Sequence, residues 1–158
     1  MKKLVVFALV IVMLMTYSAF FVSCSAQIEE GRYSYAECDA EWVDEISGSQ
    51  KKELAEAYGY ENKKDYISEK TANVSEAFLG SSFVFNNDGT GEFWIANQKE
   101  IFTWKQDGKK IDIDFDGNEA SIIFGNTDFE ISSGDLVAQV HDVENLYALT
   151  IILTYKLK

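Results

Sequence analysis

The chain has 158 residues, room for one domain of ordinary size, and its 47% of apolar residues can bury a proper core. It carries 14 Lys+Arg against 26 Asp+Glu, and this net charge of −12 argues against nucleic acid as a partner, because phosphates need Lys and Arg. Two Cys and one His exclude a disulfide scaffold, a Cys/His zinc site and most histidine-based chemistry, so we expect no metal and no cofactor.

Residues 1–23 have the layout of a secretory signal, with a short basic start, a long apolar run and a zone of small residues. The tetrad Phe21-Val22-Ser23-Cys24 resembles the lipobox of bacterial lipoprotein signal peptides, in which the cysteine becomes the lipidated first residue. This resemblance predicts a lipid on Cys24 and a domain held at the outer side of a membrane by its lipid anchor.

Two alternatives to lipidation stay open. Cleavage after Ala26 would release a secreted protein, and an uncleaved apolar run would itself remain as an anchor. All three interpretations place the domain outside the cytoplasm, as a part of the cell envelope or as a secreted protein. The net charge becomes −14 when residues 1–23 are removed, since they hold two Lys and no acid, and an anionic membrane surface repels such a domain. The tether, residues 24–30, reaches at most about 25 Å, so the domain would lie close to the membrane.

The mature domain is expected over residues 31–158, and it begins with a strand over 31–38, where Tyr33 and Tyr35 share one face. Residues 39–79 then predict a helical insertion. A first helix is expected over 50–58 with Ser49 as its N-cap, and Cys38 before it is expected as a small core residue.

A second helix is expected from Asn62, its N-cap, to Leu79. The apolar side chains of this helix recur at spacings of four, three and four, which puts them on one face. They are Ile67, Thr71, Val74 and Phe78.

From Ser81 onward the apolar period changes to two, and turn signals such as Asn87-Asp88-Gly89 and Asp107-Gly108 come often. The pattern predicts eight strands, near 82–87, 91–97, 100–106, 109–115, 119–124, 127–132, 135–141 and 146–157. In the last of them Tyr147, Leu149, Ile151, Leu153, Tyr155 and Leu157 share one face, as expected of a strand with one buried side.

Hairpin-linked strands in this number predict a mainly β fold. We expect an antiparallel up-and-down meander of about eight or nine strands that closes into a barrel, with two helices inserted after the first strand. Closure would pair the first strand with the last and remove the free sheet edges.

The run from Phe83 to Gly91, followed by Phe102-Thr103-Trp104 and Gly108-Lys109-Lys110-Ile111, resembles small lipocalin-like proteins of bacteria, many of them predicted lipoproteins. Gly31-Arg32-Tyr33 lies where lipocalins place Gly-x-Trp on their first strand. The resemblance covers best about residues 81–115, and it implies a lipocalin-like barrel and an export route, without an established ligand.

Two short motifs contain residues that are typical of functional sites. Asp112-Ile113-Asp114-Phe115-Asp116-Gly117 has the start of a calcium loop, but its twelfth position is Ile123, which offers no oxygen, so an ordinary strand with solvent-facing acids is expected. His141 stands beside Asp142, and neighbours on a strand point to opposite faces, so they form no dyad. We therefore expect a protein that is not an enzyme.

The barrel interior is the remaining candidate for a site. A small barrel either holds one small ligand or is filled by its own side chains, and the bulk of the aromatic residues expected inside favours filling. If a small apolar ligand binds, it would contact Phe83, Phe85, Phe93, Phe102, Trp104, Phe115, Tyr147 and Tyr155. The alternative is a protein-interaction or structural envelope module with a filled barrel and an unknown protein partner.

Overall fold

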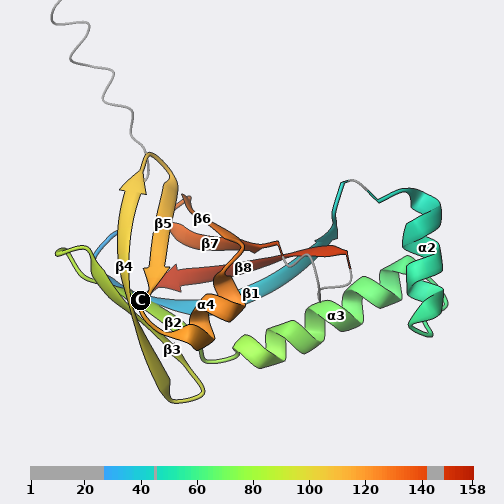
Figure 1. Ribbon diagram of the computed structural model, residues 1–158, viewed down its shortest axis with the longest axis horizontal. Coiled ribbons are helices and arrows are strands. Elements are labelled where there is room, and N and C mark those ends of the chain that lie inside the picture. Colours follow the sequence, from blue (N-terminus) through green and yellow to red (C-terminus); the bar gives the residue numbers. More distant parts are fainter. Residues whose placement is uncertain (1–26, 45, 142–147) are drawn as a thin grey trace, which may run out of the picture.

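Eight antiparallel strands close into a barrel in the computed structural model of the protein (Figure 1), which describes residues 27–44, 46–141 and 148–158. Neighbouring strands pair in chain order, and the last strand pairs with the first. The bounds are β1 (Gly31–Trp42), β2 (Ser82–Phe85), β3 (Thr90–Ile95), β4 (Gln98–Asp107), β5 (Lys110–Phe115), β6 (Thr127–Ser132), β7 (Asp135–Val140) and β8 (Leu149–Leu157). The predicted closed meander is confirmed.

The seam between β1 and β8 is the longest pairing of the sheet. It runs from Tyr33 opposite Leu157 to Trp42 opposite Leu149, with a bulge between Tyr35 and Glu37. Because β8 offers partners along this whole length, residues 39–42 continue the strand, and their prediction as part of the helical insertion was wrong.

Two helices follow β1, as expected: α2 (Gly48–Ala57) and α3 (Lys63–Phe78). The N-cap of α2 is Ser47 rather than Ser49. Ser47 is favoured as the N-cap because it forms a capping box with Gln50, in which each side chain accepts a hydrogen bond from the other residue's backbone N–H. The side chain of Asn62 caps α3 as predicted, by accepting from the backbone N–H groups of Lys64 and Asp65.

Helix α3 packs along the outside of β1 and reaches back to the barrel (Figure 1). The predicted stripe is confirmed, since Ile67, Val74 and Phe78 pack against the buried core. Near the start of α3, Trp42 stacks on the buried ring of Tyr66, with ring centroids 5.3 Å apart. These contacts fix the helical hairpin, which consists of α2 and α3, to the part of β1 that extends beyond its pairing with β2.

The segment predicted as a strand over 119–124 is a helix, α4 (Asn118–Phe124). It lies where the barrel wall is thinnest, since β5 and β6 share only two pairs, Lys110 with Glu130 and Ile111 with Phe129. A helix brings Phe124 inward at this gap. Ile122, on the same helix, points outward and is 82% exposed.

Candidate functional site

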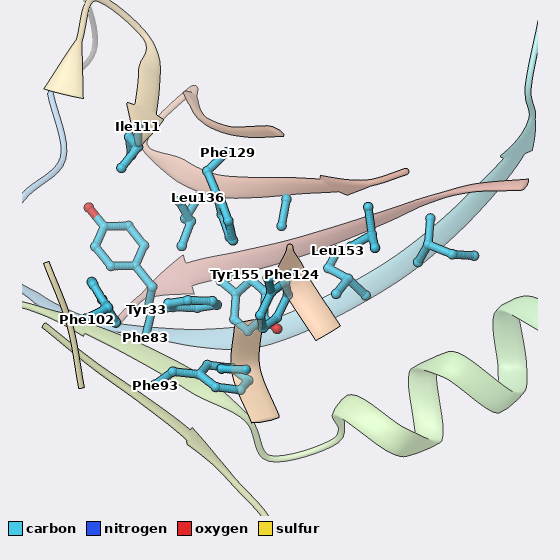
Figure 2. Packing of buried hydrophobic residues seen from close by; sticks show 14 of the residues in the cluster. Tyr33, Phe83, Phe93, Phe102, Ile111, Phe124, Phe129, Leu136, Leu153 and Tyr155 are labelled. Atoms are coloured by element: carbon cyan, nitrogen blue, oxygen red, sulfur yellow. The ribbon is translucent and has the colours of Figure 1, made fainter. Parts of the chain in front are cut away.

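Aromatic rings fill the middle of the barrel (Figure 2). Phe83 is fully buried at their centre, and its ring centroid lies within 6.2 Å of those of six other rings. The nearest is Phe93 at 4.7 Å, and Tyr155 meets Phe83 edge to face at 5.0 Å. The six are Phe85, Phe93, Phe102, Phe124, Phe129 and Tyr155.

The structure brings together all but one of the residues predicted to line the interior. Phe83, Phe85, Phe93, Phe102 and Tyr155 are fully buried. Burial raises the pKa of Tyr155, whose hydroxyl oxygen accepts a hydrogen bond from the Ser81 hydroxyl.

Trp104 and Phe115, two more of these residues, are half-buried at the edge of the ring cluster. The Trp104 ring lies 5.3 Å from Phe85, and Phe115 stacks on Phe124. The eighth predicted residue, Tyr147, lies outside the described residues, as does the predicted lipidation site Cys24.

A pocket of about 250 Å³ lies beyond the rings, between α3, α4 and strands β7 and β8. We call it the mouth pocket. Every side chain that lines it is apolar: Val74, Phe78, Ile122, Ile123, Val140, Ile151 and Leu153. Space for an apolar molecule is therefore found where α3 crosses the end of the barrel, next to the rings rather than among them.

A second pocket of about 260 Å³ shares Ile123 with the mouth pocket and ends at Glu100. The Glu100 carboxylate accepts a hydrogen bond at 2.8 Å from the backbone N–H of Ala120, in the first turn of α4. Gly117 makes room for this contact, since a Cβ there would stand 2.2 Å from Glu100 Oε2. Glu100 thus holds α4 against β4, and through α4 it positions one wall of the mouth pocket.

A shallow groove of about 510 Å³ separates β1 from α3 near the helical hairpin. It is lined by Asp39, Trp42, Lys63, Lys64, Ile67, Ser68 and Thr71. Trp42 packs under the helical segment, where its ring stacks on Tyr66, whereas Trp94 does not.

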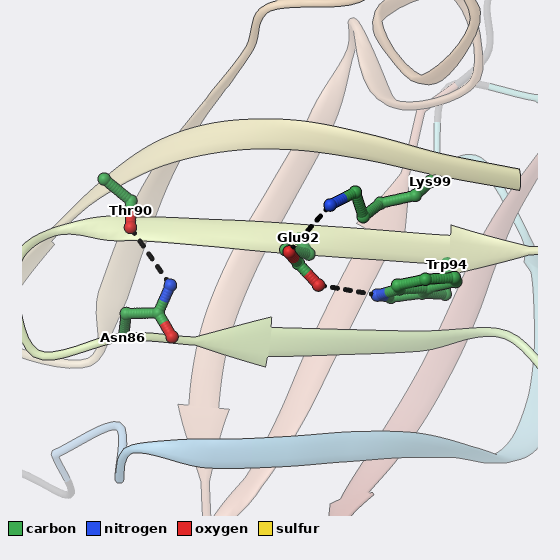
Figure 3. A network of polar contacts seen from close by, with 5 residues as sticks. All are labelled: Asn86, Thr90, Glu92, Trp94 and Lys99. Carbon is green, nitrogen blue, oxygen red and sulfur yellow. Dashed lines mark hydrogen bonds and ion pairs between the residues drawn. The ribbon is translucent and has the colours of Figure 1, made fainter.

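Trp94 lies on the outer face of β3, within a small network of charged residues (Figure 3). Its indole N–H donates to Glu92 at 2.9 Å, and Lys99 donates to the other oxygen of the same carboxylate at 3.0 Å. The hydrogen bonds from Lys99 and Trp94 lower the pKa of Glu92. The Arg32 guanidinium stands 5.9 Å from the Trp94 ring, so the network ties β1, β3 and β4 together on the surface.

The acids of the calcium-like motif follow the strand interpretation: Asp112 and Asp114 are exposed on β5, and Asp112 pairs with Lys110. His141 contacts Asp128 at 3.2 Å, while its sequence neighbour Asp142 lies outside the described residues. In the part of the chain that the structure describes, no three His, Cys, Asp or Glu side chains are grouped so that they could hold a metal ion.

Cys38 is half-buried on β1, where burial raises the pKa of its thiol to about 11. Such a thiol is mostly protonated at neutral pH and is a poor nucleophile.

No helix within residues 27–44, 46–141 and 148–158 is long and apolar enough to span a membrane.

Sequence reasoning found the ring cluster and the α3 stripe, but it missed the α4 side of the mouth pocket. The missed signal was the spacing of Ala120, Ile123 and Phe124, which is that of one helical face.

None of the protein-family models matches the sequence, and a search of curated proteins finds no relative. Among solved structures, the chain is similar to a DUF4847 family protein from Bacteroides vulgatus ATCC 8482, known from a crystal structure at 1.00 Å resolution. The TM-score is 0.45 at 15% sequence identity, and the alignment covers 82% of this chain and 94% of that chain. That degree of similarity assigns neither a family nor a function to the chain.

Proposed function

We propose that the protein is a non-catalytic, lipid-anchored module of the cell envelope, which uses a lipocalin-like barrel as a scaffold and binds a small apolar ligand in the mouth pocket. The signal-like N-terminus with Cys24 supports the anchor. The mouth pocket supports the ligand, and it is the observation that carries this proposal.

The proposed ligand site differs from the one expected from the sequence. The rings around Phe83 occupy the middle of the barrel, and their centroid distances of 4.7 to 6.2 Å are those of packed aromatic pairs. A ligand there would have to displace them. At the mouth, by contrast, Val74 and Phe78 of α3 are half-buried and face apolar strand residues across open space. Covering an apolar surface of this kind with a hydrocarbon removes it from water, which favours binding.

The binding test fills the mouth pocket from its helical side. Purified protein is titrated with Nile red, an apolar dye whose emission rises in a dry site, and with fatty acids as competitors. Val74→Phe should abolish dye binding, because the larger ring occupies the pocket. Ala72→Phe, which adds the same ring to an exposed position of the same helix, should leave binding unchanged. Circular dichroism checks that both variants fold.

Failure of the unaltered protein to bind the dye, or equal binding by both variants, would rule out the mouth pocket as a ligand site. The filled interior would then favour the second candidate, a structural or protein-interaction module without a ligand. The groove beside Trp42 is the surface that such a partner would contact. Mass spectrometry of the protein extracted from membranes tests the anchor separately, because a diacylglycerol group on Cys24 adds a defined mass.

A further inference from the structure

Several loops and both ends of the described chain gather at one end of the barrel. We call it the hairpin end and define it as residues 27–32, 86–90, 105–112, 130–135 and 156–158. It contains the turns of the β2–β3, β4–β5 and β6–β7 hairpins. Hydrogen bonds join its parts: the backbone N–H of Ile28 donates to the side-chain oxygen of Gln106 at 2.9 Å, and the backbone N–H of Lys158 donates to the carbonyl of Arg32 at 3.0 Å. Helix α2 lies at the opposite end of the molecule (Figure 1).

Charge is distributed unevenly between this end and the rest of the barrel. The hairpin end holds six exposed cations, Arg32, Lys105, Lys109, Lys110, Lys156 and Lys158, against seven acids. In the remaining described barrel residues, 33–44, 80–141 and 148–158 outside the hairpin end, ten acids stand against the single cation Lys99. The helical hairpin, residues 47–79, is nearly balanced, with five cations and six acids.

The acids outside the hairpin end lie at different distances from it. Glu92 is near, since the charge of Arg32 helps to lower its pKa. Asp114 follows Asp112 by two positions on β5, whereas Glu37 is farther away. Glu37 follows Arg32 by five positions on β1, which is about 17 Å along an extended strand. This exceeds the Debye length of about 8 Å at physiological ionic strength. An anionic surface at the hairpin end therefore meets a nearly balanced set of charges that includes six lysines and arginines. The same surface along the side of the barrel would meet the acids.

We propose that the hairpin end is the face that lies against an anionic membrane surface, so that α3 and the mouth pocket point away from the bilayer. This orientation rests on the proposed lipid anchor, because the short tether leaves the barrel at this end: the backbone N–H of Ile28 donates to Gln106 of the hairpin end, and that of Glu29 donates to the hydroxyl of Tyr33, the residue next to it. The charge of −14 opposes adsorption of the domain as a whole, but its uneven placement selects one pose once the lipid holds the protein there.

Energy transfer to the bilayer tests this orientation. In a Cys38→Ala background, a fluorophore is placed at Ser133→Cys in the hairpin end or at Asn97→Cys in the β3–β4 turn on the opposite side, both exposed. Lipidated full-length protein is reconstituted in vesicles of phosphatidylcholine mixed with phosphatidylglycerol, which carry a headgroup acceptor. At low salt, transfer from position 133 should exceed that from position 97 by at least about twofold.

Charge reversal separates electrostatic orientation from the effect of the tether alone. The triple variant Lys105→Glu, Lys109→Glu and Lys158→Glu should reduce the difference between the two positions. The matched control, Lys51→Glu, Lys52→Glu and Lys64→Glu on the helical hairpin, changes the net charge equally and should preserve it. Equal transfer from both positions in the parent protein, or an effect of the control as large as that of the test variant, would overturn the orientation.

If mass spectrometry finds no lipid on Cys24, the proposed anchor fails, yet the orientation can still be measured. Cys24 of the full chain is then coupled to a maleimide lipid, and the same two positions are read. A difference that persists in pure phosphatidylcholine vesicles and after charge reversal would show that the tether, not the charge, sets the pose, and would also refute the proposal.

Discussion

Phe83→Ala removes the ring around which the barrel interior is packed. This side chain is fully buried and is surrounded by other aromatic rings. A buried Phe→Ala change costs about 3–5 kcal/mol. Phe83 belongs to six aromatic pairs, whose contacts add to the buried area that is lost, so we expect a loss in the upper part of this range, about 4–5 kcal/mol. That is a large part of the roughly 5–15 kcal/mol that stabilises an ordinary domain.

Urea denaturation followed by intrinsic fluorescence measures this loss as a change in midpoint at constant slope. Phe83→Leu keeps most of the apolar volume and should cost about 1.5 kcal/mol. Ile101→Ala, at a position that is 47% exposed, should cost less than about 0.5 kcal/mol. A loss below about 2 kcal/mol for Phe83→Ala would refute the packed interior, and it would return the lumen to consideration as a ligand site.

Three further predictions concern backbone fit, alkaline pH and thiol reactivity. Gly91→Ala should destabilise the barrel by about 1–3 kcal/mol in the same assay, because its Cβ would stand 2.2 Å from the Phe102 ring, whereas Gly48→Ala, with no atom within 4 Å, should not destabilise it. Burial raises the pKa of Tyr155 above its ordinary 10.0, so the unfolded chain loses this proton at a lower pH than the folded protein does. The contribution of Tyr155 to the free energy of unfolding is therefore fully present below about pH 10 and should fall as the pH rises further. Urea midpoints that stay constant up to about pH 11.5 would contradict this prediction. The pKa of Cys38 rises from 9.0 to about 11, so its thiolate fraction at neutral pH, and with it the rate of alkylation by iodoacetamide, should be roughly a hundredfold lower in the folded than in the urea-unfolded protein. Equal rates in both states would mean that Cys38 is not shielded.

The closed barrel could be predicted because its signals are local and repeated. Alternation along β8 and the turn residues between short strands indicate the eight observed strands and the order in which they pair. Phe83, Phe85 and Phe93 could be placed inside for the same reason, since side chains on a strand with one buried face alternate.

Helix α4 could not be recognised in this way, because its apolar run Ile122-Ile123-Phe124 is short and rich in β-branched residues, and such a run suits a strand or a buried helix equally. The helix is favoured over a strand by the gap between β5 and β6, and this gap is a property of the assembled barrel. The mouth pocket depends on α4 and on where α3 crosses the strands, so its location required coordinates. The uneven charge of the barrel likewise becomes visible only when strand register places distant lysines at one end.

The overhang of β1 beyond its pairing with β2 links the lengths of two dissimilar elements. β2 meets β1 only as far as Ser34, yet β1 continues to Trp42, about 26 Å further along the strand. The chain must cover that span on its way back, and the sixteen residues of α3 do so, at about 24 Å as a helix. A shortened relative that loses one turn of α3 should therefore also lose about two residues from β1 and from the start of β8, so that the helix and the extended part of β1 change length together.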